Sequence, residues 1–470
     1  MKISNILYFS ILTVFLVSCG LKDRYQQPEI AKELQENLIR DNVSKDTVSL
    51  ANISWQEFFT DETLKALIQE GLNNNYDLQN AIIQIAATEA ALRQSKLAFL
   101  PNLNFAPTTT FNNQSKHALN LPPNININLQ TTTISLGLTS NWEIDIWGKL
   151  ASQKRANLAN WLSIKASKNA VQTALVANIA NMYYTLLALD KQLKITKETI
   201  VIREKSVQAI KALNISGTAT SVDIAQAESN LYAAEITRQE LKQAIREAEN
   251  MICVLLASPM KEIPRGNFDN QTMNSELKIG VPMLLLSNRP DVKAAEMQFR
   301  KEYELVNVAK ASFYPSLNLN AGSMGISALT TRALFNINAF FLNLVGGITQ
   351  PIFSRGVLKS NLKQQQVRQE VALNTFKNTL IKAGYEVSNA MFAYQTISDK
   401  KEFRDKQIEA LKTAVHASTQ LLQFSSRVTY TDVLVSEQNL INAQLNQVND
   451  QLLQYKAMIE LYRALGGGLE

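Results

Sequence analysis

The chain has 470 residues, of which 46% are hydrophobic and 19% charged, and its formal net charge is +6. With 11 prolines and 16 glycines it lacks the composition of a disordered or collagen-like chain. The positive charge is spread along the sequence and forms no basic stripe, so nucleic-acid binding is not expected.

The N-terminus has the layout of a bacterial lipoprotein signal peptide. Lys2 precedes a short, mainly apolar run from Ile6 to Val17, and Cys19 follows after one small residue. Such a run is too short to span a bilayer and is normally removed. We therefore expect residues 1–18 to be a signal peptide, Cys19 to carry lipid and residues 19–60 to form an extended, lipid-anchored segment. An ordinary signal peptide with an incidental cysteine is the alternative.

Side chains that catalyse reactions or bind metals are few and scattered. The two histidines, His117 and His416, lie far apart, and neither has a partner at the spacing of a zinc site. No phosphate-binding loop or nucleophile elbow is present. Cys253 lies in an apolar helical run, which predicts a buried, inert thiol. We expect no catalytic residues, no metal, no cofactor and no enzymatic activity.

The mature chain repeats one order of motifs. Asp77 and Asp291 each introduce a helix that leads to a proline-containing turn and then to alternating segments, and the separations along the two halves nearly agree. We expect a first repeat over residues 61–270 and a second over residues 271–470. Each would contain a helix, strands and a long helical hairpin, in the first repeat with strands at about 101–142 and the hairpin at about 148–257, and in the second with strands at about 315–351 and the hairpin at about 356–465.

Apolar residues recur at alternating spacings of three and four along the long helices. In the first hairpin the series includes Leu175, Ile179 and Leu186, and it is broken at Thr196 and Arg203. This spacing predicts antiparallel coiled-coil hairpins. A soluble coiled-coil scaffold without a pore has the same pattern.

Four segments between the helices alternate apolar with polar or small residues, namely 103–111, 134–142, 317–322 and 342–348. Their alternation and their lengths are close to those of membrane-spanning β-strands. Four strands cannot close a barrel, and open edges in lipid leave backbone groups unpaired. Several chains would have to share one barrel. A small soluble β-domain is the alternative.

Several motifs resemble those of TolC-type outer-membrane efflux factors, especially the lipid-anchored branch that serves multidrug pumps. They occur in family order over nearly the whole mature chain and comprise Trp142–Leu150, Arg289–Val292, Phe313–Leu317, Gln350–Gly356 and Ala464–Gly468. The resemblance implies a mainly α fold with a β-barrel part. It implies a homotrimer with a twelve-stranded outer-membrane barrel and a coiled-coil α-barrel in the periplasm. Such a protein is a passive duct for drugs or other small molecules supplied by an inner-membrane pump and a periplasmic adaptor.

The turns of the two hairpins are the expected periplasmic tips. The resemblance implies that tips contact the adaptor, which here assigns Gly217, Ser425 and Ser426, and that they close the tunnel. The candidate gate residues are Asp223, Arg427, Tyr430 and Asp432. Capping of a helix N-terminus is the simpler role for the two aspartates. The family usually has glycine in both turns, whereas the second turn here has Ser425-Ser426-Arg427.

Two residues at the boundary between strand and helix, Trp142 and Trp147, are either interfacial anchors or plain packing residues, and Asp145 could cap the following helix. Two other function classes remain open. One is an outer-membrane duct for protein secretion or metal efflux, and the other is a lipid-anchored scaffold. The cargo cannot be deduced from these residues.

Overall fold

The structure is a computed structural model that describes residues 25–26, 53–115, 129–272, 289–320, 323–424 and 429–468. The chain divides into two compact units. One consists of Met1–Pro28, Ile85–Ser163 and Ala295–Thr375, and the other of Glu29–Gln84, Ile164–Ala294 and Phe376–Glu470. Each unit therefore combines parts of both halves of the sequence.

Helices make up most of the described residues. The long ones form two pairs, α6 (Lys149–Ile215) with α7 (Ser221–Leu255), and α10 (Val357–Phe424) with α11 (Tyr430–Ala464). The shorter helices are α3 (Trp55–Phe58), α4 (Glu62–Asn74), α5 (Tyr76–Leu97), α9 (Pro290–Ala311) and the 3-10 turns η3 (Phe268–Asn270) and η4 (Ile337–Ala339). Within the described part of the chain, no helix is both long and apolar enough to cross a membrane.

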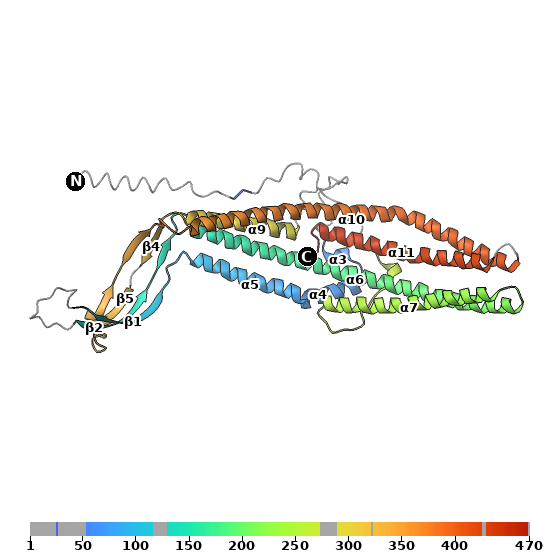
Figure 1. Ribbon diagram of the computed structural model, residues 1–470, viewed down its shortest axis with the longest axis horizontal. Helices are drawn as coiled ribbons and strands as arrows, with labels where there is room; N and C mark the ends of the chain where they lie inside the picture. The colour runs from blue at the N-terminus through green and yellow to red at the C-terminus, as the bar shows by residue number, and fades with distance from the viewer. Residues whose placement is uncertain are drawn as a thin grey trace, which may run out of the picture. The chain divides into compact units, whose positions relative to one another are not determined.

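The described strands form two antiparallel sheets in the first unit (Figure 1). They are β1 (Asn104–Asn113), β2 (Gln130–Thr139), β3 (Trp142–Ile144), β4 (Ser316–Asn320), β5 (Ser323–Ala328), β6 (Phe340–Leu342) and β7 (Val345–Thr349). The strand orders are β1-β2-β5-β6 and β3-β4-β7. Strands are thus present in all four segments expected from the alternation, and β5 extends the third region to Ala328.

Two of the four expected segments, 134–142 and 342–348, divide between the two sheets, which the alternation did not predict. Between β2 and β3, Asn141 forms two hydrogen bonds with Asn102. The Asn141 backbone N–H donates to the Asn102 side-chain oxygen at 2.7 Å, and the Asn102 N–H donates to the Asn141 carbonyl at 3.1 Å. A side chain here takes the place of a backbone acceptor, which ends the ladder locally.

The second unit contains two helical hairpins (Figure 1). An ion pair of 2.7 Å between Lys211 and Glu228 joins α6 to α7. The Asp450 carboxylate of α11 forms ion pairs with Lys400 Nζ of α10 at 2.8 Å and with Arg404 Nε of α10 at 2.9 Å. The antiparallel hairpins predicted from the heptad spacing are confirmed.

The core of this unit follows the heptad series. Ile179, Leu186 and Cys253 are fully buried, so the prediction of a buried thiol is confirmed. Aromatic residues fill the middle of the core, where the rings of Phe58 and Tyr462 stack with their centroids 4.2 Å apart. Such rings bury a large area each, which makes them a main source of stability in this unit.

Candidate functional site: a two-faced sheet and the helical tips

The four-stranded sheet has one apolar and one polar face. Residues that pair directly lie on the same face. The apolar face carries Phe105, Pro107, Leu136, Leu138, Met324, Ile326, Phe340 and Leu342. The opposite face carries small or polar residues, among them Thr108, Ser135, Gly137, Gly325 and Ser327. Large side chains of the apolar face are exposed in the single chain, Phe105 by 66% and Phe340 by 57%.

At the boundary between strand and helix, polar groups fix the start of α6. The Asp145 carboxylate accepts from Leu150 N at 3.1 Å and from Ala151 N at 2.8 Å, so the predicted cap is confirmed. Trp142 and Trp147 each donate an indole N–H to a backbone carbonyl, of Phe99 at 2.8 Å and of Pro315 at 2.7 Å. The two tryptophans therefore fix this boundary to the segments around Phe99 and Pro315, and this role does not depend on whether lipid or water surrounds them.

The helix that follows each tip, α7 or α11, starts with the same motif. Asp223 Oδ2 accepts from the Thr220 backbone N–H at 2.8 Å and from its hydroxyl at 2.7 Å, while the Asp223 N–H donates to Thr220 Oγ1 at 3.3 Å. Thr429 and Asp432 form the same capping box. These hydrogen bonds hold the pKa of both aspartates below the usual value. Within the single chain, both carboxylates cap helices.

A buried polar cluster lies between the two hairpins near the tips, and it was not expected from the sequence. Arg203 of α6 lies with its Nη1 3.6 Å from Glu437 Oε2 of α11, and its Nη2 donates to Gln438 Oε1 at 3.2 Å. The side chains of Arg203 and Glu437 are 3% and 14% exposed. Burial raises the pKa of Glu437, and the charge of Arg203 opposes that shift. The one feature of the sequence that could have indicated this cluster is Arg203 itself, a charged residue at a core position of the heptad series.

Of the candidate gate residues, the structure describes Asp223, Tyr430 and Asp432, and Tyr430 is half-buried. Burial raises the pKa of the Tyr430 hydroxyl, Ser206 lowers it, and the charges of Glu437 and Asp223 add to the increase. Gly217, with a φ of 80°, makes the first tip. Ser425, Ser426 and Arg427 lie outside the described residues.

The N-terminal Tyr25 binds to one face of α9. Its ring centroid lies 6.1 Å from that of Phe299 and 5.6 Å from that of Tyr303, and the Arg300 guanidinium carbon lies 5.2 Å from the ring. Burial, with the nearby carboxylate of Glu296, raises the pKa of Tyr25 to about 12. Cys19 lies outside the described residues.

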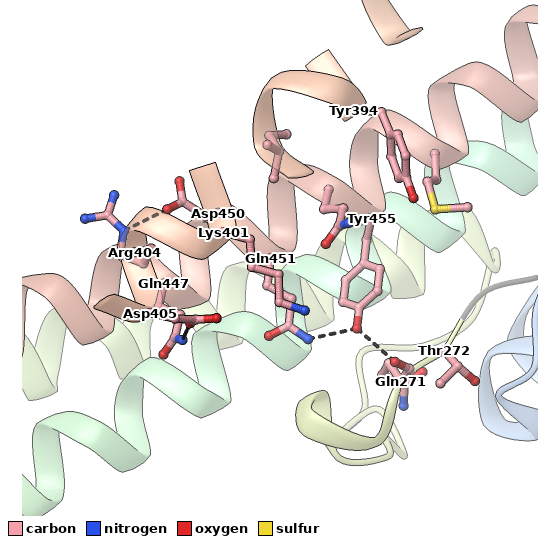
Figure 2. Close-up of a pocket in the computed structure, with 13 residues that line it drawn as sticks. Gln271, Thr272, Tyr394, Lys401, Arg404, Asp405, Gln447, Asp450, Gln451 and Tyr455 are labelled. Carbon is pink, nitrogen blue, oxygen red and sulfur yellow. Dashed lines mark hydrogen bonds and ion pairs between the residues drawn. The ribbon is translucent and has the colours of Figure 1, made fainter. Parts of the chain in front are cut away.

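A cavity of about 340 Å³ opens between α10, α11 and the segment after η3 (Figure 2). Its charged and polar groups are largely paired with one another. Asp450 is neutralised by Arg404, and the Tyr455 hydroxyl accepts from Gln451 at 2.9 Å and donates to the Gln271 carbonyl at 3.0 Å. Over the described ranges, no cluster of His, Cys, Asp and Glu could hold a metal ion. We assign no reaction to this cavity.

Comparison with known proteins identifies the family. The family model "Outer membrane efflux protein" matches residues 67–258 and 281–467. The chain is 26% identical over 459 residues to the cation efflux system protein CusC of Escherichia coli, covering 96% of each chain. It is 27% identical over 478 residues to the toluene efflux pump outer membrane protein TtgF of Pseudomonas putida, covering 98% of this chain and 96% of TtgF.

A crystal structure of a membrane protein from Pseudomonas aeruginosa has the same fold. Its TM-score is 0.86 at 24% identity, with 96% of this chain and 98% of that chain covered. The expected fold class, mainly helical with long hairpins and a smaller strand region, is confirmed. The family model covers most of both halves, and it describes efflux proteins of the outer membrane, not enzymes. The chain belongs to the outer membrane efflux protein family, as its motifs predicted.

Proposed function

We propose that three copies of this chain form the outer-membrane duct of a tripartite efflux system, which receives its cargo from a periplasmic adaptor and an inner-membrane pump. The observation that carries the proposal is the two-faced sheet. Its apolar side suits lipid and its polar side suits a water-filled lumen. The relatives CusC and TtgF are named for efflux systems, which supports the same role here.

The strands are the reason to expect three copies. In the described sheets β1 lies at one edge, and β6 and β7 lie at the other. Unpaired edges in hydrocarbon cost several kcal/mol per backbone group, so the edges must pair with other chains. Three sets of four strands would close a twelve-stranded barrel. Detergent-purified protein should have about three times the mass of the 52.5 kDa chain in light scattering, and a stable monomer with intact β-structure would exclude the shared barrel.

We further propose that Cys19 is acylated and that Tyr25 holds the anchored segment against α9. Tyr25 follows Cys19 by only six positions, so the lipid can lie no more than about 20 Å from this contact. Wild-type protein should incorporate labelled palmitate. The Cys19→Ser variant should incorporate none and still fold, because its strands and helices do not need the lipid to form. Absence of label in the wild type would contradict the anchor.

For the periplasmic end we propose a gate. Asp223, Tyr430 and Asp432 would act together with Arg427 to hold three pairs of tips closed, since a permanently open duct would leak. Gly217, Ser425 and Ser426 would contact the adaptor. A guanidinium can bridge two carboxylates. Changing Arg427 and Asp432 together to Ala should raise single-channel conductance in planar bilayers and sensitise cells to large antibiotics such as vancomycin. Unchanged conductance at normal trimer yield would leave Asp432 with its capping role alone.

The class of cargo has two candidates, because one relative is named for cations and the other for toluene. Deleting the gene should lower tolerance to metal cations in the first case and to organic solvents or drugs in the second. A lipid-anchored scaffold without a pore would form no channels in planar bilayers. Ion conduction therefore separates the duct from the scaffold before any cargo is tested.

A further inference from the structure

Phe341 is an aromatic residue on the polar face of the four-stranded sheet. It pairs with Gly325 of β5, and Gly325 pairs with Gly137 of β2. Its neighbours Phe340 and Leu342 lie on the apolar face and are 57% and 55% exposed. Phe341 is only half-buried and points to the other side, because successive side chains of a strand alternate between faces.

The other described residues of that face are small or polar. They are Asn104, Ala106, Thr108, Thr110 and Asn112 of β1, Thr131, Thr133, Ser135, Gly137 and Thr139 of β2, and Gly325 and Ser327 of β5. Phe341 is thus the one aromatic side chain on this face within the described strands. The two nearest positions across the sheet are Gly325 and Gly137. Neither has a side chain that would confine the ring.

Gly325 beside Phe341 is required by the close approach of β2 and β5. A Cβ atom at Gly325 would lie 2.1 Å from the Leu136 carbonyl oxygen and 2.6 Å from Gly137 Cα. Covering such glycines is one role for an aromatic neighbour. That role concerns the stability of the sheet alone, and it predicts no effect on what passes along its polar face.

We propose that Phe341, repeated once in each copy of the chain, forms an apolar constriction in the lumen of the barrel. This inference rests on the proposed duct, because it takes the polar face as the lumen wall. Eight strands leave an interior just wide enough for side chains to fill, so a twelve-stranded barrel has open space that three aromatic rings narrow but do not fill. Apolar constrictions disfavour hydrated solutes by dewetting. The ring therefore favours apolar and amphipathic cargo over large hydrophilic compounds.

The position of the ring along the strands permits a test that does not depend on the periplasmic tips. Phe341 pairs with Gly325, three residues before β5 ends at Ala328, and so shares a row with Gly137 of β2. Thr139 lies on the same face as Gly137 and two residues further along β2, toward the start of α6. A cysteine at position 139 is therefore reached from outside only after passing Phe341.

The experiment measures labelling of Thr139→Cys in trimers in intact cells, with a small methanethiosulfonate reagent and a bulky polymer-linked maleimide added outside. With Phe341 present, the small reagent should react and the bulky one should react slowly. Phe341→Ala should speed the bulky reagent by about tenfold. Phe341→Trp should slow it further. Phe340→Ala is the matched control, because it removes a similar ring from the opposite face, and it should change neither rate.

The outcomes separate the two levels of the proposal. Equal rates in wild type, Phe341→Ala and Phe341→Trp would overturn the constriction while leaving the duct intact. If the small reagent cannot label Thr139→Cys but labels Leu138→Cys, the polar face is not the lumen wall and the proposed duct itself fails. If Phe341→Ala gives no trimer, the Phe341→Trp rate decides, since a residue with only a covering role would not slow a reagent when it is enlarged.

Discussion

Replacing Arg203 by Met should loosen the contact between the two hairpins near the tips. The Arg203 side chain is 3% exposed, and its charge faces Glu437 at 3.6 Å. Methionine keeps much of the side-chain volume but leaves the Glu437 carboxylate buried without its cation. Losing one partner of a buried pair costs far more than the pair contributes by itself, because the remaining charge is uncompensated.

The size of the effect follows from the burial of both groups. Breaking buried pairs typically costs about 3–5 kcal/mol, and the lost bond from Arg203 to Gln438 adds about 1 kcal/mol. Glu437 keeps 14% exposure and can relieve part of the cost by taking up a proton, so we expect about 3 kcal/mol. A loss of this size makes local opening about 100-fold more frequent.

Amide hydrogen exchange in α6 and α11, measured on detergent-purified trimers, tests this magnitude. Arg203→Met should speed exchange around residues 203 and 437 about 100-fold. Glu437→Gln should have a smaller effect than Arg203→Met, because burial already favours the neutral form of residue 437 and the Arg203 guanidinium keeps its hydrogen bond to Gln438 Oε1 at 3.2 Å. The double variant should recover most of the protection because no buried charge is left. Lys211→Met is the matched control, since Lys211 of the same helix forms an exposed pair with Glu228. A double variant that exchanges as fast as Arg203→Met would refute the reasoning.

Three further predictions follow from single sites. The pKa of Glu437 is raised in the folded chain. Its contribution to stability is therefore complete below the usual pKa of 4.5 and is lost as the pH rises through the folded-state pKa. Amide exchange around Glu437, corrected for the intrinsic rate, should speed up over that pH window in the wild type and not in Glu437→Gln. Tyr25→Ala should expose the N-terminal segment to limited proteolysis by removing aromatic contacts worth about 0.5–1.5 kcal/mol each, while Tyr25→Phe should stay protected; equal cleavage of both would contradict the contact. Gly325→Ala should reduce trimer yield because its Cβ would meet the Leu136 carbonyl oxygen at 2.1 Å, whereas Gly347→Ala, where no atom lies within 4 Å, should assemble normally.

The helices and the sheet faces could be predicted because their signals are periodic and local. Heptad spacing identified Ile179 and Leu186 as core residues, and alternation identified the segments that became strands. The interruption after β2 could not be predicted. It depends on Asn102 and Asn141 exchanging hydrogen bonds across a turn, and asparagine occurs equally well in turns that do not do this.

At the tips, the capping boxes had a local signature. A threonine followed three residues later by an acidic residue predicts a helix start, and both Thr220-Asp223 and Thr429-Asp432 follow this rule. The partner of Arg203 had no such signature. Glu437 lies more than two hundred residues away in the sequence, so only the fold shows which carboxylate faces the buried guanidinium.

The duplication sharpens this point. Glu228 and Glu437 each lie five residues after the capping aspartate of their helix, so they occupy matching positions in the two repeats. Glu228 pairs with Lys211 of its own hairpin on an exposed surface, whereas Glu437 reaches the buried Arg203 of the other hairpin. The same residue type at the same position thus stabilises one hairpin in the first repeat and joins two hairpins in the second. If the second hairpin moves when the duct opens, the pair between Arg203 and Glu437 must break or move with it, while the pair between Lys211 and Glu228 can stay intact.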